Sequence, residues 1–253
     1  MHAAKVRKDS FMKFAIPHVT TTLLFFGVAS ISFASPNDPP NYPHAIPHPA
    51  GGHVTSPAHV AWIAQAIALE RQEEWQPLMQ LGYQWTRAEP GNATAWFVFG
   101  RALTAMYRYP DAIEAYQRLL KIDPRDVYAR NNLGDAYRET QRPLLAMHTY
   151  CDALRIDPDY MPAWQNLGMT FFKLRGMAGV SQALQKLRAS DPELAEAWSN
   201  LLIGYSQTQD ERIAQQAVKV LRALPKSRRE QMFNILFSSV APTIGSQHIS
   251  CLT

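Results

Sequence analysis

Four of the eight histidines stand close together near the start of the chain, and imidazole is well suited to binding transition metals. His44, His48, His53 and His59 fall within one short stretch. A tract of this composition can capture copper, zinc or nickel. Proline and glycine interrupt it, however, and neither cysteine nor methionine stands in it. We therefore interpret the tract as a solvated linker and predict no metal site and no cofactor, with metal handling as an alternative function.

The two cysteines suggest a structural link more than a reactive site. His148 and Cys151 stand one helical turn apart and could form half of a metal site, although an ordinary surface pair is the interpretation we favour. In an oxidising compartment, a disulfide between Cys151 and Cys251 would tie the end of the chain to its middle. Spacing alone leaves this pairing open.

Motifs for catalysis are absent from the sequence. It contains no G-x-S-x-G, no glycine-rich phosphate loop, no H-E-x-x-H and no C-x-x-C-H. We therefore expect no enzyme activity. One acceptor sequence for N-glycosylation, Asn92-Ala93-Thr94, would matter only in a eukaryotic cell.

Positive charge is concentrated at the start of the chain. Residues 1–34 carry a net +3 of the formal +4, so the remainder is nearly neutral. A nucleic-acid-binding protein needs a clustered basic face, and this distribution does not indicate one. We therefore predict no nucleic-acid partner.

The same segment has the order of a secretory signal. Lys13 precedes an apolar stretch that ends at Ala29, and Ser32-Phe33-Ala34 places small residues where a signal peptidase cuts. We predict that residues 1–34 are removed and that the mature chain, starting near Ser35, is periplasmic or secreted. Polar residues within the stretch make it a poor membrane anchor, so membrane association is expected only if the signal is not cleaved.

Residues 35–58 contain seven prolines. Because proline supports neither a helix interior nor a sheet ladder, we predict a flexible Pro/His-rich linker over these residues. Helical periodicity begins near His59.

Beyond the linker, three residue types recur with a constant 34-residue period. This interval separates Pro90, Pro124, Pro158 and Pro192, then Trp62 and Trp96, Trp164 and Trp198, and finally Gly100, Gly134 and Gly168. Such a period is typical of stacked helix-turn-helix units. Stacked units form an extended binding surface rather than a catalytic pocket, so the period indicates an interaction protein.

Residues 93–126 show the pattern of one unit most cleanly. The apolar face of the first helix carries Trp96, Phe99, Gly100 and Leu103. A break at Pro110 separates it from a second helix that carries Ala112 and Tyr116. We expect Gly100 and Ala112 to let the two helices approach closely, with Trp96 and Tyr116 filling the space on either side.

The recurring order of Trp, Leu-Gly, Tyr, Ala, aromatic, Ala and Pro resembles the tetratricopeptide repeat (TPR) family. The resemblance covers about residues 59–228 and implies an all-α fold, a right-handed α-α superhelix. The units that it implies are 59–92, 93–126, 127–160, 161–194 and 195–228. We expect a capping helix over residues 229–241 and a tail over residues 242–253.

In TPR proteins the first helix of each unit lines a concave groove, so the resemblance also implies a partner-binding surface. The residues that it places there are Phe97, Arg101, Asn131, Asn132, Asp135, Arg138, Gln165, Asn166, Met169, Phe172, Asn200 and Ile203. Asn132, Asn166 and Asn200 keep the repeat interval and are similar to the asparagine ladder of the O-linked N-acetylglucosamine glycosyltransferases. An amide both donates and accepts hydrogen bonds, so a ladder of this kind can bind the backbone of an extended peptide.

The carboxylate clamp of chaperone-binding TPR domains is not expected, because Phe97 and Pro162 occupy positions where that clamp holds basic residues. The function we predict is a non-catalytic scaffold or assembly chaperone that binds a peptide segment or a partner protein outside the cytoplasm. Its general build is similar to the periplasmic TPR chaperones of cytochrome c maturation and of pilus assembly, a likeness that does not identify the partner. A regulatory subunit of an envelope enzyme is an alternative, beside metal handling.

Overall fold

The computed structural model describes residues 57–203 and 211–238, which form helices joined by short turns. The helices are α1 (Pro57–Arg71), α2 (Trp75–Ala88), α3 (Ala93–Ala105), α4 (Tyr109–Ile122), α5 (Val127–Glu139), α6 (Pro143–Ile156), α7 (Met161–Ser190), α8 (Pro192–Ile203), α9 (Glu211–Ala223) and α10 (Lys226–Ser238). No strand occurs in these described ranges. The prediction of an all-α helical-repeat superhelix is confirmed.

Several of the segments predicted from the sequence lie wholly or mostly outside the residues that the structure describes. The signal over residues 1–34, most of the linker over residues 35–58 and the tail over residues 242–253 stay predictions. Helix α1 begins at Pro57, just inside the predicted linker, because proline is compatible with the first turn of a helix. Helix α10 begins at Lys226, slightly before the predicted cap.

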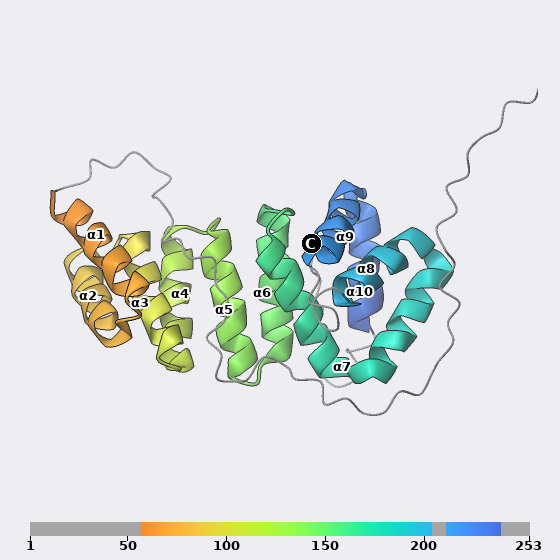
Figure 1. Ribbon diagram of the computed structural model, residues 1–253, viewed down its shortest axis with the longest axis horizontal. Coiled ribbons are helices and arrows are strands. Elements are labelled where there is room, and N and C mark those ends of the chain that lie inside the picture. The colour runs from red at the N-terminus through yellow and green to blue at the C-terminus, as the bar shows by residue number, and fades with distance from the viewer. Residues whose placement is uncertain (1–56, 204–210, 239–253) are drawn as a thin grey trace, which may run out of the picture. The chain divides into compact units, whose positions relative to one another are not determined.

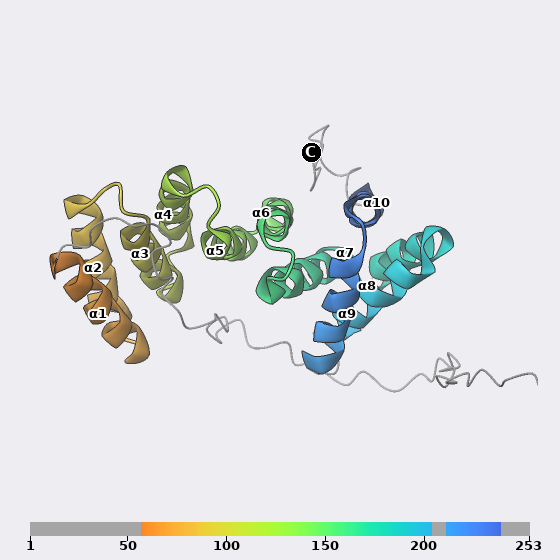
Figure 2. The same cartoon turned by 90° about the horizontal axis from the view of Figure 1, so that it is seen from above.

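From α1 to α9 each helix packs on the next one along the chain, whereas α10 packs on α7 (Figure 1). In the first three units, α1, α3 and α5 pack on α2, α4 and α6, and each second helix packs on the first helix of the next unit. Seen from above, α3, α5 and α7 lie on one side and α4 and α6 on the other (Figure 2). Among the first helices, α5 also contacts both α3 and α7.

Glycine sets the distance between neighbouring helices. A Cβ added to Gly82 of α2 would lie 2.7 Å from the Phe99 Cα atom of α3, and one added to Gly100 would lie 2.7 Å from the Tyr116 ring. Tyr116 is fully buried over Gly100, as the sequence predicts. Trp96 is only half-buried and packs against the edge of the same core cluster as Tyr116.

The repeating tryptophans and prolines are joined by a hydrogen bond. The indole Nε1 of Trp96 donates to the carbonyl oxygen of Pro90 at 2.8 Å, and Trp164 makes the same bond to Pro158 at 2.9 Å. In the third unit Arg130 replaces the tryptophan, and its guanidinium donates to the carbonyl oxygen of Pro124. The arginine at this tryptophan position is thereby explained, since both side chains anchor the turn before a first helix.

Side-chain caps begin the first helices of the second and third units. The Asn92 side chain accepts hydrogen bonds from the backbone N–H groups of Thr94 and Ala95, and Asp126 accepts one from Ala129. Each cap satisfies an N–H group that has no partner within its helix. Both caps stand immediately before the predicted start of their unit.

The fifth unit departs from this register. Its first helix, α8, begins at Pro192 rather than at residue 195, because Asp191 accepts a hydrogen bond from the Leu194 N–H and so caps the helix early. Pro192 thereby enters the first helical turn instead of the preceding turn. The buried Nε1 of Trp198 has no hydrogen-bond partner in the described residues, in contrast to the tryptophans of units two and four.

A left-handed residue ends the first helix of each of the first three units. These residues are Glu73 (φ 57°), Tyr107 (φ 59°) and Gln141 (φ 60°), which are separated by the repeat interval. In the fourth unit the positive φ falls on Gly176 (φ 62°), which separates the two halves of α7. Glycine adopts this conformation without steric cost, whereas other L-residues are strained in it.

We therefore expect Gln141→Gly to stabilise the chain by about 0.5–1 kcal/mol, because it relieves this strain at the end of α5. Urea unfolding followed by circular dichroism measures the change. Gln84, exposed in the interior of α2, provides the matched control. Gln84→Gly should destabilise by about 1 kcal/mol, and equal losses from both substitutions would contradict the explanation.

Candidate functional site

The first helices of units one and two are joined by a buried ion pair. The Nε and Nη2 atoms of Arg101 on α3 lie 3.0 and 2.5 Å from Oε1 of Glu70 on α1. The two side chains are only 7% and 10% exposed, and the guanidinium also lies over the Trp75 ring. Arg101, predicted to contact a partner, is thus engaged within the protein.

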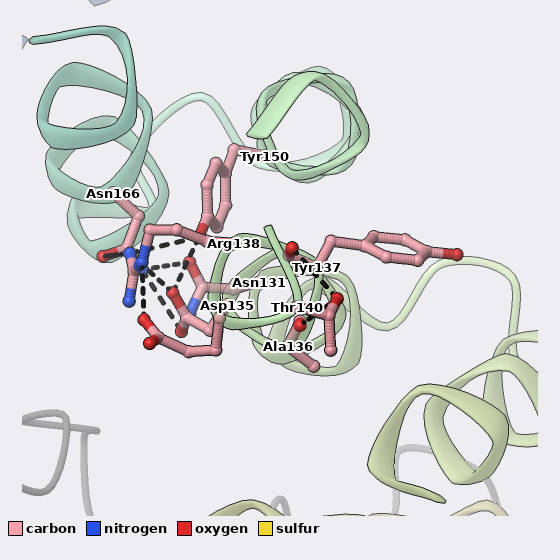
Figure 3. A network of polar contacts seen from close by, with 9 residues as sticks. Asn131, Asp135, Ala136, Tyr137, Arg138, Thr140, Tyr150 and Asn166 are labelled. Atoms are coloured by element: carbon pink, nitrogen blue, oxygen red, sulfur yellow. Dashed lines mark hydrogen bonds and ion pairs between the residues drawn. The ribbon is translucent and has the colours of Figure 1, made fainter. Parts of the chain in front are cut away.

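A second polar cluster surrounds Arg138 on α5 (Figure 3). Its Nη1 lies 3.0 Å from Oδ1 of Asp135, 3.2 Å from the Tyr150 hydroxyl and 3.2 Å from Oδ1 of Asn166. Its Nε donates to Oε1 of Glu139 at 3.1 Å. The cluster connects α5 to α6 through Tyr150 and to α7 through Asn166.

Asp135 is almost fully enclosed in this cluster, with its side chain 2% exposed. The Tyr150 hydroxyl donates to Oδ1 of Asp135 at 2.7 Å, and the amide of Asn131 donates to Oδ2 at 3.3 Å. Asn166 donates to Oδ1 of Asn131 at 3.0 Å and to Oδ2 of Asp135 at 3.4 Å. The buried carboxylate is therefore surrounded by donors, as a buried charge requires.

These contacts fix the protonation states of the cluster. Burial lowers the pKa of Arg138, but the negative charge of Asp135 and contributions from Tyr150 and Glu139 outweigh it and raise the pKa above its ordinary value. Burial, and then the charge of Asp135, raise the pKa of Tyr150. The guanidinium of Arg138 thus stays charged, and the phenol of Tyr150 stays a hydrogen-bond donor.

The predicted ladder of exposed asparagines is wrong at its first member. Asn132 is 4% exposed and hydrogen-bonds the hydroxyl of Tyr116, whose pKa burial raises to about 12. Asn166 belongs to the Arg138 cluster, and Asn200 is half-buried on α8. The three amides therefore have different surroundings, because equal spacing along the chain does not make their neighbours equal.

The other predicted contact residues differ in their accessibility. Phe97 is 4% exposed and lies edge-on to Tyr116, so it belongs to the core. Met169 on α7 is 39% exposed, while Gln165 and Phe172 on the same helix are half-buried. The side chain of Ile203 lies outside the described residues. The part of the predicted surface that a partner can reach is therefore centred on Met169.

Sequence reasoning missed Glu70, Glu139 and Tyr150 as members of these polar clusters. The position of Glu70 in the sequence could have indicated its pairing with Arg101. The interval between the two residues is shorter than the 34-residue repeat by about one helical turn. That spacing places two side chains of opposite charge on adjacent first helices. Tyr150 carried no such signal, because it occupies the aromatic position that also fits a purely apolar core.

The two histidines in the described residues, His59 and His148, contact polar and aromatic side chains. His59 lies edge-on to Trp85, with its Nδ1 3.3 Å from Oε2 of Glu89 and 3.0 Å from the amide of Asn92. His148 pairs with Asp152 at 3.5 Å. The described residues contain no group of three or more potential metal ligands. His44, His48 and His53 lie outside the description, so metal handling by the tract stays a prediction.

Two further sequence features can be placed. The amide nitrogen of Asn92 donates to Oε2 of Glu89 at 2.5 Å, and its amide oxygen caps α3, so a glycan on the nitrogen would have to be accommodated beside Glu89. Cys151 is buried on α6 and is disulfide-bonded. Cys251, the only other cysteine in the sequence, lies outside the described residues. Within the described ranges, no helix combines the length and apolar character needed to cross a membrane.

Two family models match the middle of the chain. A model described as TPR repeat matches residues 100–141, and a model described as Tetratricopeptide repeat matches residues 127–160. The chain therefore contains TPR repeats, which the two matches cover over residues 100–160. The resemblance drawn from the repeat period is thereby confirmed for the family.

Two solved TPR structures resemble this TPR protein at low identity. TTC0263 from Thermus thermophilus, a thermophilic TPR protein, is 21% identical with a TM-score of 0.44, over 70% of this chain and 98% of that one. YrrB, titled as a TPR protein with an unusual peptide-binding site, is 16% identical with a TM-score of 0.44, over 76% and 89% of the two chains. No curated protein matches the chain. The family assignment therefore depends on the two repeat matches.

Removing the carboxylate at the centre of the Arg138 cluster should destabilise this TPR protein. Asp135→Ala leaves a largely buried guanidinium without its closest charge partner, and we expect a loss of about 2–4 kcal/mol in urea unfolding. Glu114→Ala breaks an exposed pair with Arg118 on α4 and should change stability by less than about 0.5 kcal/mol. Losses of similar size in both variants would show that the cluster contributes no more than a surface pair.

Proposed function

We propose that this TPR protein is a non-catalytic scaffold or assembly chaperone, and that it binds a peptide segment or partner protein on its first-helix side. The TPR family supports a role in protein–protein interaction. The observation that carries the proposal is Met169, a large apolar side chain that is 39% exposed on α7, among the first-helix residues predicted to face a partner.

The surroundings of Met169 suit a peptide. Methionine is flexible and polarisable, so it adapts to apolar side chains of varied shape. Gln165 lies one helical turn before it and Phe172 nearly one turn after it, so an amide and an aromatic ring flank the methionine on one helix face. An amide can bind peptide backbone, while methionine and phenylalanine contact side chains.

The neighbouring polar clusters limit the kind of contact that this surface offers. Arg101 and Arg138 are paired with Glu70 and Asp135, and breaking such pairs would leave buried charges. Binding here therefore depends on apolar contact and hydrogen bonding more than on charge. The same clusters hold the first helices in place before a partner arrives, which lowers the entropic cost of binding.

The test is capture of partners by the purified full chain, with Met169→Glu compared with wild type. A carboxylate at this position has to be desolvated on binding, so capture should fall about tenfold. Leu145 on α6 is 47% exposed on the second-helix side, and Leu145→Glu is the matched control. Crosslinking and quantitative mass spectrometry measure both variants against wild type. Partners retained by Met169→Glu but lost by Leu145→Glu would place binding on the other side.

We further propose that the chain acts outside the cytoplasm, in the periplasm or as a secreted protein. The support is the signal-like order of residues 1–34. In the native cell, we expect a product that begins near Ser35 and is released with other exported proteins. N-terminal sequencing of the fractionated product measures this. A full-length product in the cytosol would overturn export, and a full-length product in the membrane would indicate an uncleaved anchor.

A further inference from the structure

A cleft of about 400 Å³ lies on the second-helix side, along α4 and at the start of α6. Arg118, Lys121 and Arg142 line it together with one carboxylate, Glu114. Arg118 lies 4.0 Å from Glu114 with both side chains more than half exposed. Lys121 and Arg142 take part in no ion pair within the described residues. The cleft therefore carries positive charge that its own residues do not neutralise.

A second cleft of about 280 Å³ lies between the α4–α5 turn and the end of α6. It is lined by Arg125, Arg130 and Arg155 around one carboxylate, Asp152. Asp152 lies 3.7 Å from Nη1 of Arg130 and 3.3 Å from Nη1 of Arg155. Arg125 has no ion pair in the described ranges. The guanidinium groups of Arg130 and Arg155 are thus paired with one carboxylate, and that of Arg125 is paired with none in the described residues.

Lys121 of the first cleft lies in the last turn of α4, and Arg125 of the second cleft lies in the α4–α5 turn that follows. Together the two clefts hold six arginine and lysine side chains and two carboxylates. Clustered charge of one sign raises the local potential and attracts a partner of the opposite sign. The first-helix side differs, because Arg101 and Arg138 are each paired with a buried carboxylate there.

We propose that this α4–α6 surface, formed by the two clefts, docks an acidic peptide segment of a partner protein. Glu114 and Asp152 interrupt the positive charge, so a uniformly charged phosphate backbone would meet repulsion that spaced carboxylates can avoid. Ile113 and Ile156 line the two clefts and provide apolar contact for side chains between the acidic ones. The surface is separate from Met169 and adds a second contact region to the proposed scaffold.

The test uses the full chain and a fluorescein-labelled peptide rich in glutamate with interspersed leucines, followed by fluorescence anisotropy. Reversal of two unpaired charges in the double variant Lys121→Glu and Arg142→Glu should weaken binding at least about tenfold. The control double variant, Lys186→Glu and Lys219→Glu, makes the same change in net charge at exposed positions on α7 and α9. It should alter binding less than about twofold.

Further measurements distinguish an acidic peptide from a nonspecific charge effect and from nucleic acid. Binding should weaken as added salt shortens the Debye length from about 10 Å at 0.1 M, and the glutamine analogue of the peptide should not bind. Equal losses in both double variants would overturn the site, because only overall charge would then matter. Tighter binding of oligothymidylate than of the peptide would replace the peptide with nucleic acid. Circular dichroism of each variant, together with the neutral pair Lys121→Gln and Arg142→Gln, excludes unfolding as the cause.

Discussion

Close contact between neighbouring helices is the constraint on which the other features of this chain depend. At Gly82 the backbone of α3 occupies the space where a Cβ atom would be, and at Gly100 the Tyr116 ring occupies it. Each unit can bury its apolar face only when the next unit lies at this distance. The helix caps and the left-handed turn residues must then recur at a constant interval, because a change in helix length would separate glycine from the group that fills its space.

This register also determines which polar side chains meet. Glu70 and Arg101 come together because adjacent first helices lie side by side, and Asn166 reaches the Arg138 cluster for the same reason. Buried polar pairs contribute little net stability compared with apolar packing, but a shifted register would leave them unpaired. We infer that they favour one alignment of the units over others. Their second consequence is that the groove residues most suited to binding a charged partner are already occupied.

The sequence therefore predicted the fold more fully than the site. The recurring prolines, tryptophans and glycines report backbone geometry that every unit shares, so the repeat and its helices could be derived from spacing. The surroundings of Asn132 and Asn166 depend on which side chains lie opposite, and those differ between units. The early start of α8 depends on a single cap by Asp191. The basic α4–α6 surface could not be predicted from the net charge, because the nearly neutral total sums the charges on both sides of the molecule.

The two sides of the repeat differ in the kind of partner contact that they can make. On the first-helix side, paired charges leave apolar and amide groups for binding, and such contacts respond weakly to salt. On the second-helix side, unpaired Lys121, Arg125 and Arg142 attract acidic groups from a distance, which mainly raises the rate of encounter. If one partner bound to both sides, the second-helix side would attract it during encounter and the first-helix side would slow its dissociation. Because the two contributions respond differently to ionic strength, the salt dependence of association and dissociation rates would assign each side its part.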